Sequence, residues 1–134
     1  MRTEDNKPNL RVLMDFCEKN NIKMYYDLNA REEMKVDDWV EGMLRRSSYL
    51  KVSTEDLTML PKDFIKTYED TAIIIHTDEK FVRVHHKGKI LADVKCPTIK
   101  VVCPIGAGDA FNAGFLCCQS ENMTERVESG IKLA

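Results

Sequence analysis

Segments typical of β-strands alternate with segments typical of α-helices along this sequence, and this order is the strongest constraint on its fold. Residues 22–28, 49–52 and 72–76 are rich in strand-forming residues, and the last segment is apolar enough to be covered on both faces. Helical periodicity separates them at residues 9–20, in a segment that begins at Asp37 and Asp38, and at residues 54–60 and 61–69. This alternation predicts an α/β fold with a mostly parallel sheet and helices on both faces.

Two further strand-like segments, residues 81–86 and 89–94, flank the dipeptide Lys87-Gly88. A two-residue connection that contains glycine favours a tight turn, so these segments predict an antiparallel hairpin at one side of the sheet. Sheets of this kind bind their ligands outside the carboxyl ends of the parallel strands. We therefore expect functional residues in the segments that follow Tyr26, Val52, His76 and Val102.

Charge and composition exclude several classes of partner. The 134 residues include 20 Lys and Arg against 22 Asp and Glu, a formal net charge of -2 that predicts no nucleic-acid partner and no membrane-surface partner. The sequence shows no apolar run of bilayer length and no secretory signal at residues 1–6. The 5 cysteines form no C-x-x-C pair, so we expect reduced thiols and a cytoplasmic location.

The segment Pro104-Ile105-Gly106-Ala107-Gly108-Asp109-Ala110-Phe111 carries most of the predicted chemistry. Small residues ahead of an apolar helix would let successive backbone N–H groups bind an anion at the helix start. A carboxylate beside a bound phosphate is costly unless Asp109 takes a proton from an alcohol that attacks that phosphate. The alternative is an ordinary glycine-containing turn with Asp109 as the helix cap.

These eight residues resemble the second signature of the ribokinase-like (pfkB) carbohydrate kinases, and other family landmarks follow in the same order. Asp27-Leu28-Asn29-Ala30-Arg31 is similar to the family's D-P-N-x-R segment, and residues 51–57 (K-V-S-T-E-D-L) are similar to K-x-N-x-x-E-L. Residues 73–81 occupy the place of the nucleotide-holding strand and loop. The resemblance implies a ribokinase-like fold and an ATP-dependent kinase that phosphorylates a sugar, sugar acid or nucleoside hydroxyl.

The resemblance also implies a role for particular residues. Asp109 would be the catalytic base and would contact the substrate, and the segment Gly106, Ala107 and Gly108 would stabilise charge on the transferred phosphoryl group. Asp56 would hold Mg²⁺ through water, and Arg31 would approach the phosphate or an acidic substrate. The expected nucleotide-binding residues are Ser53, His76, Thr77 and Asp78.

Several positions differ from the family pattern. Cys103-Pro104 stands where the family usually has Asp-Thr, which removes a residue of its monovalent-cation site. Ser53 and Asp56 replace the Asn and Glu of N-x-x-E. Residues 77–81 (T-D-E-K-F) replace the usual G-x-x-G, and the two added carboxylates would repel a triphosphate unless they turn away or bind a metal.

Family members are considerably longer, so residues 1–134 are expected to form the carboxyl-terminal, phosphoryl-transfer part of one domain, without its lid and amino-terminal half. One sheet edge would then be exposed unless a partner chain or a second copy covers it. The chain alone is expected to be weakly active or inactive. The alternatives are a non-catalytic assembly or binding module, a truncated paralogue of a sugar kinase, and a fragment of an incomplete gene model.

Overall fold

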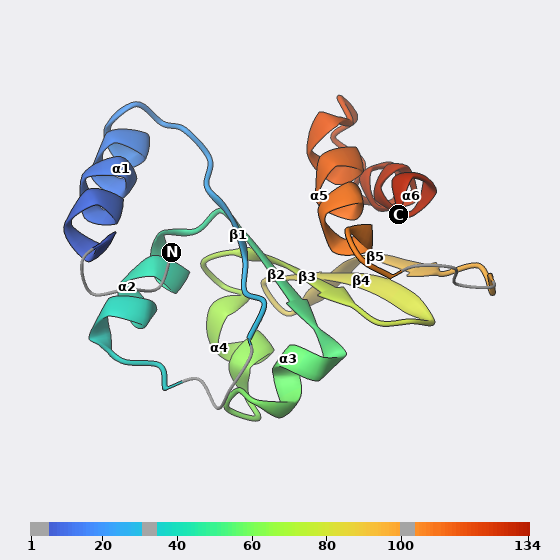
Figure 1. Cartoon of the computed structure of the whole chain (residues 1–134), viewed down its shortest axis with the longest axis horizontal. Coiled ribbons are helices and arrows are strands. Elements are labelled where there is room, and N and C mark those ends of the chain that lie inside the picture. Colours follow the sequence, from blue (N-terminus) through green and yellow to red (C-terminus); the bar gives the residue numbers. More distant parts are fainter. Residues whose placement is uncertain (1–5, 31–34, 100–103) are drawn as a thin grey trace.

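The computed structural model describes residues 6–30, 35–99 and 104–134, and their central feature is a twisted sheet (Figure 1). Its strand order is β1-β2-β3-β4-β5. The first three strands run parallel, and the last two continue the sheet in antiparallel pairing. The strands are β1 (Tyr25–Asp27), β2 (Tyr49–Ser53), β3 (Ile73–Thr77), β4 (Phe81–His86) and β5 (Lys89–Lys95).

This topology confirms the predicted parallel sheet with a hairpin at one side. Lys87 and Gly88 form the hairpin turn with φ of 49° and 71°, the left-handed backbone that such tight turns require. The strands begin and end within a few residues of the predicted bounds. The largest difference is at β1, where only three of the residues predicted as a strand pair with β2.

Helices lie on both sides of the sheet (Figure 1). Helices α2, α3 and α4 cover one face, and α5 and α6 cover the other. Helix α1 lies next to α2, at a distance from the strands. The helices are α1 (Lys7–Lys19), α2 (Asp38–Arg46), α3 (Thr54–Thr58), α4 (Phe64–Tyr68), α5 (Ala107–Cys117) and α6 (Met123–Leu133).

Alternating side chains of the strands build one apolar cluster on each face. Leu50 and Ile74 point to the α3–α4 side and pack with Phe64, whereas Ile75 points to the other side and packs with Phe115 of α5. Both faces of β3 are therefore covered, as its apolar sequence predicts. Within the described residues, no helix combines the length and apolar composition needed to span a membrane.

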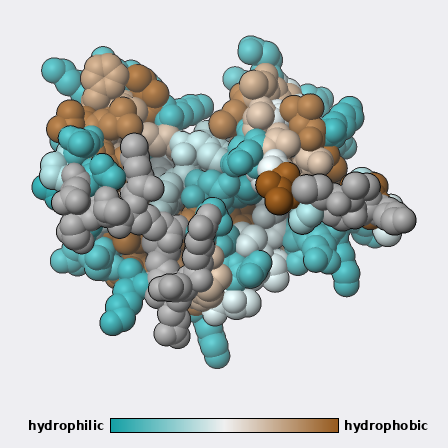
Figure 2. Space-filling view, in the orientation of Figure 1, coloured by the Kyte–Doolittle hydropathy of each residue, from teal (hydrophilic) through white to brown (hydrophobic). Residues whose placement is uncertain are grey.

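Helix α1 keeps much of its apolar face at the surface. Met14 is buried, whereas Leu13 is 54% exposed and Phe16 is 57% exposed. Figure 2 shows hydrophobic side chains gathered over this helix. An ion pair from Arg46 of α2 to Asp15, at 2.9 Å, attaches α1 to its neighbour. The predicted amphipathic helix is confirmed, but its apolar stripe is only partly packed.

The crossing of α5 and α6 is too close for side chains at two glycines. A Cβ at Gly114 would lie 2.4 Å from the Ser129 carbonyl oxygen, and one at Gly130 would lie 2.7 Å from Phe111 ring carbons. Backbone atoms cannot retreat as a flexible side chain can. The helix pair that carries the glycine-rich turn is therefore held at a fixed, short separation.

Replacing Gly114 by alanine is expected to destabilise the protein by about 1–3 kcal/mol, the usual cost of overpacking a well-packed site. The matched control is Gly42→Ala in α2, where a Cβ meets nothing within 4 Å. That change should stabilise the protein by up to about 1 kcal/mol, because alanine favours a helix. Urea denaturation followed by circular dichroism measures both, and equal stability of Gly114→Ala and wild type would contradict the close crossing.

Candidate functional site

A glycine in a left-handed conformation ends the turn before α5. Gly106 is the N-cap residue of α5 with φ of 85° and ψ of -6°, a left-handed conformation that favours glycine. Gly106 has no side chain that could accept a hydrogen bond from the first N–H groups of the helix. Asp109 lies in the first turn, three residues after the N-cap position. Asp109 is therefore not the N-cap residue, although an acidic residue in the first turn is also an ordinary stabilising feature of a helix.

The first turn of α5 leaves donors and a carboxylate available to a ligand. Ala107 N–H donates to the Pro104 carbonyl at 3.3 Å and Ala110 N–H donates to the Gly106 carbonyl at 2.9 Å. Within the described residues, the N–H groups of Gly108 and Asp109 and the Asp109 carboxylate have no hydrogen-bond partner. Asp109 is exposed. Two open donors thus lie beside a free carboxylate.

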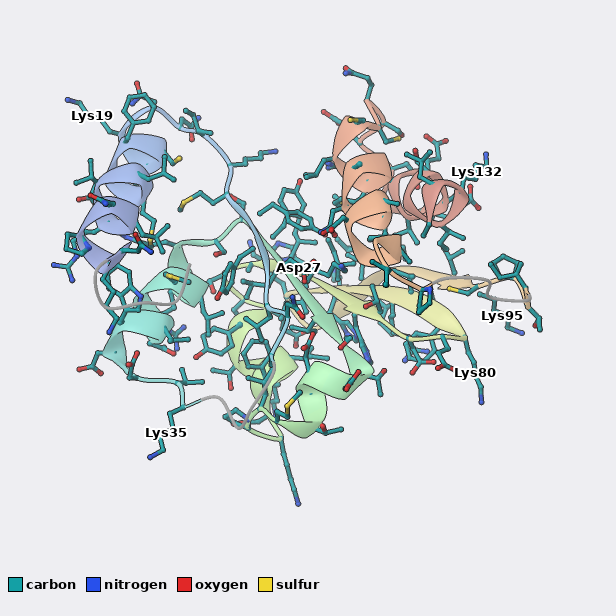
Figure 3. All side chains as sticks on the ribbon, in the orientation of Figure 1. Lys19, Asp27, Lys35, Lys80, Lys95 and Lys132 are labelled. Atoms are coloured by element: carbon teal, nitrogen blue, oxygen red, sulfur yellow. The ribbon has the colours of Figure 1, made fainter. Side chains whose placement is uncertain are left out.

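A partly buried polar network connects this turn to β1 and β2. Lys51 Nζ donates to Asp27 Oδ2 at 2.8 Å and to the Gly108 carbonyl oxygen at 3.4 Å. Asn112 Nδ2 donates to the same Asp27 oxygen at 2.8 Å, and Tyr25 Oη donates to Asn112 Oδ1 at 2.9 Å. Asp27 is labelled near the centre of the molecule in Figure 3. The network brings α5 against strands that lie far from it in sequence.

Burial raises the pKa of Tyr25 well above its ordinary value, and the nearby Asp27 carboxylate acts in the same direction. The phenol therefore stays protonated throughout the neutral range, so it remains a hydrogen-bond donor to Asn112. This fixes the direction of the hydrogen bonds along the network.

Asp56 has a structural role at the start of α3. Its Oδ2 accepts the Ser53 N–H at 2.7 Å, while Ser53 Oγ accepts the Asp56 N–H at 2.9 Å, which makes a capping box. Its Oδ1 accepts the Ala30 N–H at 2.7 Å, and the residue is 6% exposed. Both oxygens are used by backbone donors, so this geometry does not fit a direct metal ligand. Within the described residues, no group of three or more His, Cys, Asp or Glu side chains is arranged to hold a metal ion.

The predicted nucleotide-binding residues meet at the carboxyl ends of β2 and β3. Ser53 and Thr77 are register partners. Thr54 Oγ1 donates to Asp78 Oδ2 at 2.7 Å and contacts His76 Nε2 at 2.9 Å. A hydroxyl has a single proton, so His76 Nε2 must carry the proton in the second contact. Thr54 thus connects two of the predicted residues, a contact that the sequence did not predict.

Hydrogen bonds and burial shift the pKa values at this cluster. The Lys80 N–H and then the Thr54 hydroxyl lower the pKa of Asp78, so its carboxylate is charged at neutral pH. Burial first, and then His85 and Arg83, lower the pKa of His76. Burial also lowers the pKa of His85, whose ring stacks on His76 with centroids 6.2 Å apart. Both imidazoles are therefore uncharged at neutral pH.

These histidines predict a loss of stability in mild acid. The unfolded chain takes up protons at an ordinary histidine pKa of about 6.5, whereas the folded chain does so only at lower pH. The free energy of unfolding is therefore highest above about pH 6.5 and decreases as the pH falls below that value. We expect a lower urea midpoint at pH 5.5 than at pH 7.5, and a smaller decrease in a His76→Gln, His85→Gln variant. An equal decrease in the two proteins would contradict this assignment.

The structure brings most of the predicted site residues to one end of the sheet. The contact of Lys51 with Gly108 places the first turn of α5 next to β2. Lys51 lies two residues before Ser53 on that strand. Arg31 and Cys103 lie outside the described residues. The pairing of Asp27, at the end of β1, with Lys51, in the middle of β2, was not predicted.

Comparison with known proteins identifies the family. The family model for pfkB family carbohydrate kinases matches residues 1–133. A ribokinase of Lactococcus lactis is 28% identical over 125 residues, which are 92% of this chain and 40% of that protein. The chain therefore spans less than half the length of this curated relative.

Solved structures show the same fold. A fructokinase of Vibrio cholerae, bound to fructose, ADP and a calcium ion, superposes with a TM-score of 0.76 at 18% identity, covering 98% of this chain and 48% of that one. An aminoimidazole riboside kinase of Salmonella enterica, bound to aminoimidazole riboside and an ATP analogue, gives 0.66 at 20% identity, covering 90% and 47%. These similarities confirm a ribokinase-like α/β fold, and the family match over residues 1–133 shows that this chain belongs to the pfkB family of carbohydrate kinases.

Proposed function

We propose that this chain is the nucleotide-binding and phosphoryl-transfer part of a kinase that phosphorylates a sugar, sugar acid or nucleoside hydroxyl. The observation that carries the proposal is the exposed Asp109 carboxylate beside the N–H groups of Gly108 and Asp109 at the start of α5, which have no hydrogen-bond partner among the residues that the structure describes. Backbone donors at a helix start bind phosphate oxygens. A carboxylate beside a bound phosphate is costly unless it accepts the proton of the attacking alcohol.

In this mechanism, the substrate hydroxyl oxygen forms a bond to the γ-phosphorus of ATP. The bond from that phosphorus to the β–γ bridging oxygen breaks, and ADP leaves. Asp109 accepts the hydroxyl proton, and the N–H groups of Gly108 and Asp109 stabilise charge on the transferred phosphoryl group. Gly106 and Ala107 hold the turn in the conformation that presents these donors.

We place the nucleotide at the carboxyl ends of β2 and β3, near Ser53, His76, Thr77 and Asp78. Asp78 is turned toward Thr54 and the Lys80 N–H, which reduces its repulsion of a triphosphate. The Vibrio cholerae relative binds ADP and a calcium ion. We propose MgATP as the donor, with the Asp56 carboxylate committed to the α3 cap, and Arg31 as a contact for phosphate or an acidic substrate.

We further propose that these residues work with an amino-terminal half of the same fold, carried on the same polypeptide or on a second chain. Within the described residues, β1 pairs only with β2, so its outer edge is open. Leu13 and Phe16 of α1 leave an apolar surface on the same side of the molecule. The four described cysteines are free, which agrees with the cytoplasmic location that we propose.

The second candidate function is a non-catalytic assembly module. The observation in its favour is the loop at residues 77–81, where Asp78 and Glu79 stand near the proposed triphosphate site. Such a module would keep the fold and the open β1 edge but would not bind nucleotide.

Calorimetric titration of the full chain with MgATP distinguishes the two functions. The kinase proposal predicts saturable binding with a micromolar dissociation constant, and equal or tighter binding to Asp109→Asn, because that change removes a negative charge from beside the phosphates. The matched control is Asp70→Asn, which removes a charge from an exposed turn. No binding to wild type would contradict the proposal and favour the assembly module.

A further inference from the structure

Lys51 is a cation where the neighbouring residues are apolar. It lies between Leu50 and Val52 in the buried strand β2 and is itself 7% exposed. Lysine is almost never buried in this way unless it is paired, because an unpaired buried charge is costly. Among the described residues, its ammonium contacts the Asp27 carboxylate at 2.8 Å, the Gly108 carbonyl oxygen at 3.4 Å and the Phe111 ring at 5.9 Å from the ring centroid.

The Gly108 carbonyl belongs to the Gly108–Asp109 peptide, whose N–H is one of the two proposed phosphate donors. The carbonyl of Gly108 and the N–H of Asp109 are parts of one planar trans peptide, so they point in opposite directions. An ammonium that holds the carbonyl oxygen therefore also fixes the direction of the Asp109 N–H. It polarises the peptide as well, which makes that N–H a stronger donor.

We infer that Lys51 is a positioning residue for phosphoryl transfer, which orients and polarises the Gly108–Asp109 peptide so that the Asp109 N–H faces the transferred phosphoryl group. This inference rests on the proposed function of that turn. Lys51 acts through the peptide and does not touch the substrate.

The residue at position 108 supports this role independently. Glycine in the first turns of a helix costs stability relative to alanine, and Gly108 has no positive φ that would require it. A Cβ at Gly108 would lie 3.3 Å from Lys51 Nζ, the only atom outside its own helix and neighbouring residues that it would meet within 4 Å among the described residues. The missing side chain thus gives the ammonium access to the carbonyl.

The position of Lys51 is itself fixed from both sides. Asp27 is its register partner on β1, and the same Asp27 oxygen accepts a hydrogen bond from Asn112, one helical turn beyond Gly108 on α5. The ends of β1 and β2 therefore contact two successive turns of α5 through one connected set of side chains. A displacement of the Lys51 ammonium must disturb the first turn of that helix.

Nuclear magnetic resonance of the full chain without ligand tests the inference directly. In Lys51→Met, we expect the Gly108 carbonyl carbon and the Asp109 amide nitrogen to shift together, and Lys51→Arg should restore part of the change. The matched control is Lys95→Met, which removes an exposed strand lysine and should leave both resonances unchanged. MgATP should bind Lys51→Met about tenfold more weakly than wild type. Without the ammonium, the Asp109 N–H is less polarised and is a weaker hydrogen-bond donor to the phosphate.

Unchanged Gly108 and Asp109 resonances in Lys51→Met, with altered Asp27 resonances alone, would show that Lys51 only pairs with Asp27 and would overturn the inference. If Lys51→Met does not fold, Lys51→Gln serves instead, because it keeps a polar side chain without the charge and should shift the same two resonances. Absence of MgATP binding to wild type would contradict the proposed function, while the ligand-free resonances would still decide the role of Lys51.

Discussion

Combining this chain with the amino-terminal half of a ribokinase-like kinase is expected to raise sugar phosphorylation about a hundredfold or more above either part alone. The physical reason is positioning, because a phosphoryl donor site without a bound acceptor leaves the reacting groups to meet by diffusion. The chain matches 40% of the Lactococcus lactis ribokinase, and under our proposal the amino-terminal part of that protein is the natural reagent. ADP release with ribose, fructose, 2-keto-3-deoxygluconate and aminoimidazole riboside as acceptors measures the effect.

The open side of the molecule supplies the control for this experiment. Phe16 of α1 is exposed and apolar, so Phe16→Ser should reduce the stimulation without lowering the stability of the chain by itself. The matched control is Lys132→Ser, an exposed residue of α6 on the other side of the molecule (Figure 3). Full sugar phosphorylation by the chain alone would contradict the proposal that the substrate-binding part lies elsewhere.

Replacing Asp109 by asparagine is expected to reduce phosphoryl transfer by about 10²–10⁴-fold, the usual contribution of a general base. Asparagine keeps the size of the side chain and the donors of the turn but cannot accept the hydroxyl proton. The dissociation constant of MgATP should therefore stay the same or fall while the turnover number collapses. Steady-state kinetics of the combined halves, with MgATP titrated at saturating acceptor, separate these two effects.

Asp70→Asn is the matched control, since it makes the same chemical change on an exposed residue and should leave the turnover number unchanged. Turnover that survives Asp109→Asn would show that another group takes the proton. A loss of MgATP affinity in parallel with turnover would instead mean that Asp109 holds the nucleotide or the turn.

Local sequence patterns predicted the parts of this structure that depend on local physics. The alternation of strand and helix segments predicted the sheet, and the pair Lys87-Gly88 predicted the hairpin, because left-handed φ angles at a two-residue turn favour glycine. The glycine-rich segment at Gly106 predicted an open helix start. The pattern Ser53-x-x-Asp56 also matches a capping box, a signal that could have identified the structural role of Asp56.

Features that depend on contacts between distant segments could not be predicted in this way. The pairing of Lys51 with Asp27 and Gly108 depends on the register of β1 and β2 and on where α5 docks. Contacts between distant segments determine both, so no short stretch of sequence predicts them. The apolar stripe of α1 predicted burial, but its periodicity cannot say what covers it. Leu13 lies on that stripe and is nevertheless 54% exposed.

We propose above that the first turn of α5 binds the phosphates of MgATP. Amide resonances of the full chain, recorded while MgATP is added, test this claim. The proposal predicts saturable shifts that are largest at the Gly106, Gly108 and Asp109 amides, with a second group at Ser53, His76 and Asp78. Gly42 and Lys132, exposed residues of α2 and α6, should not respond. Shifts that spare the α5 turn, or no saturable shifts at all, would contradict the claim.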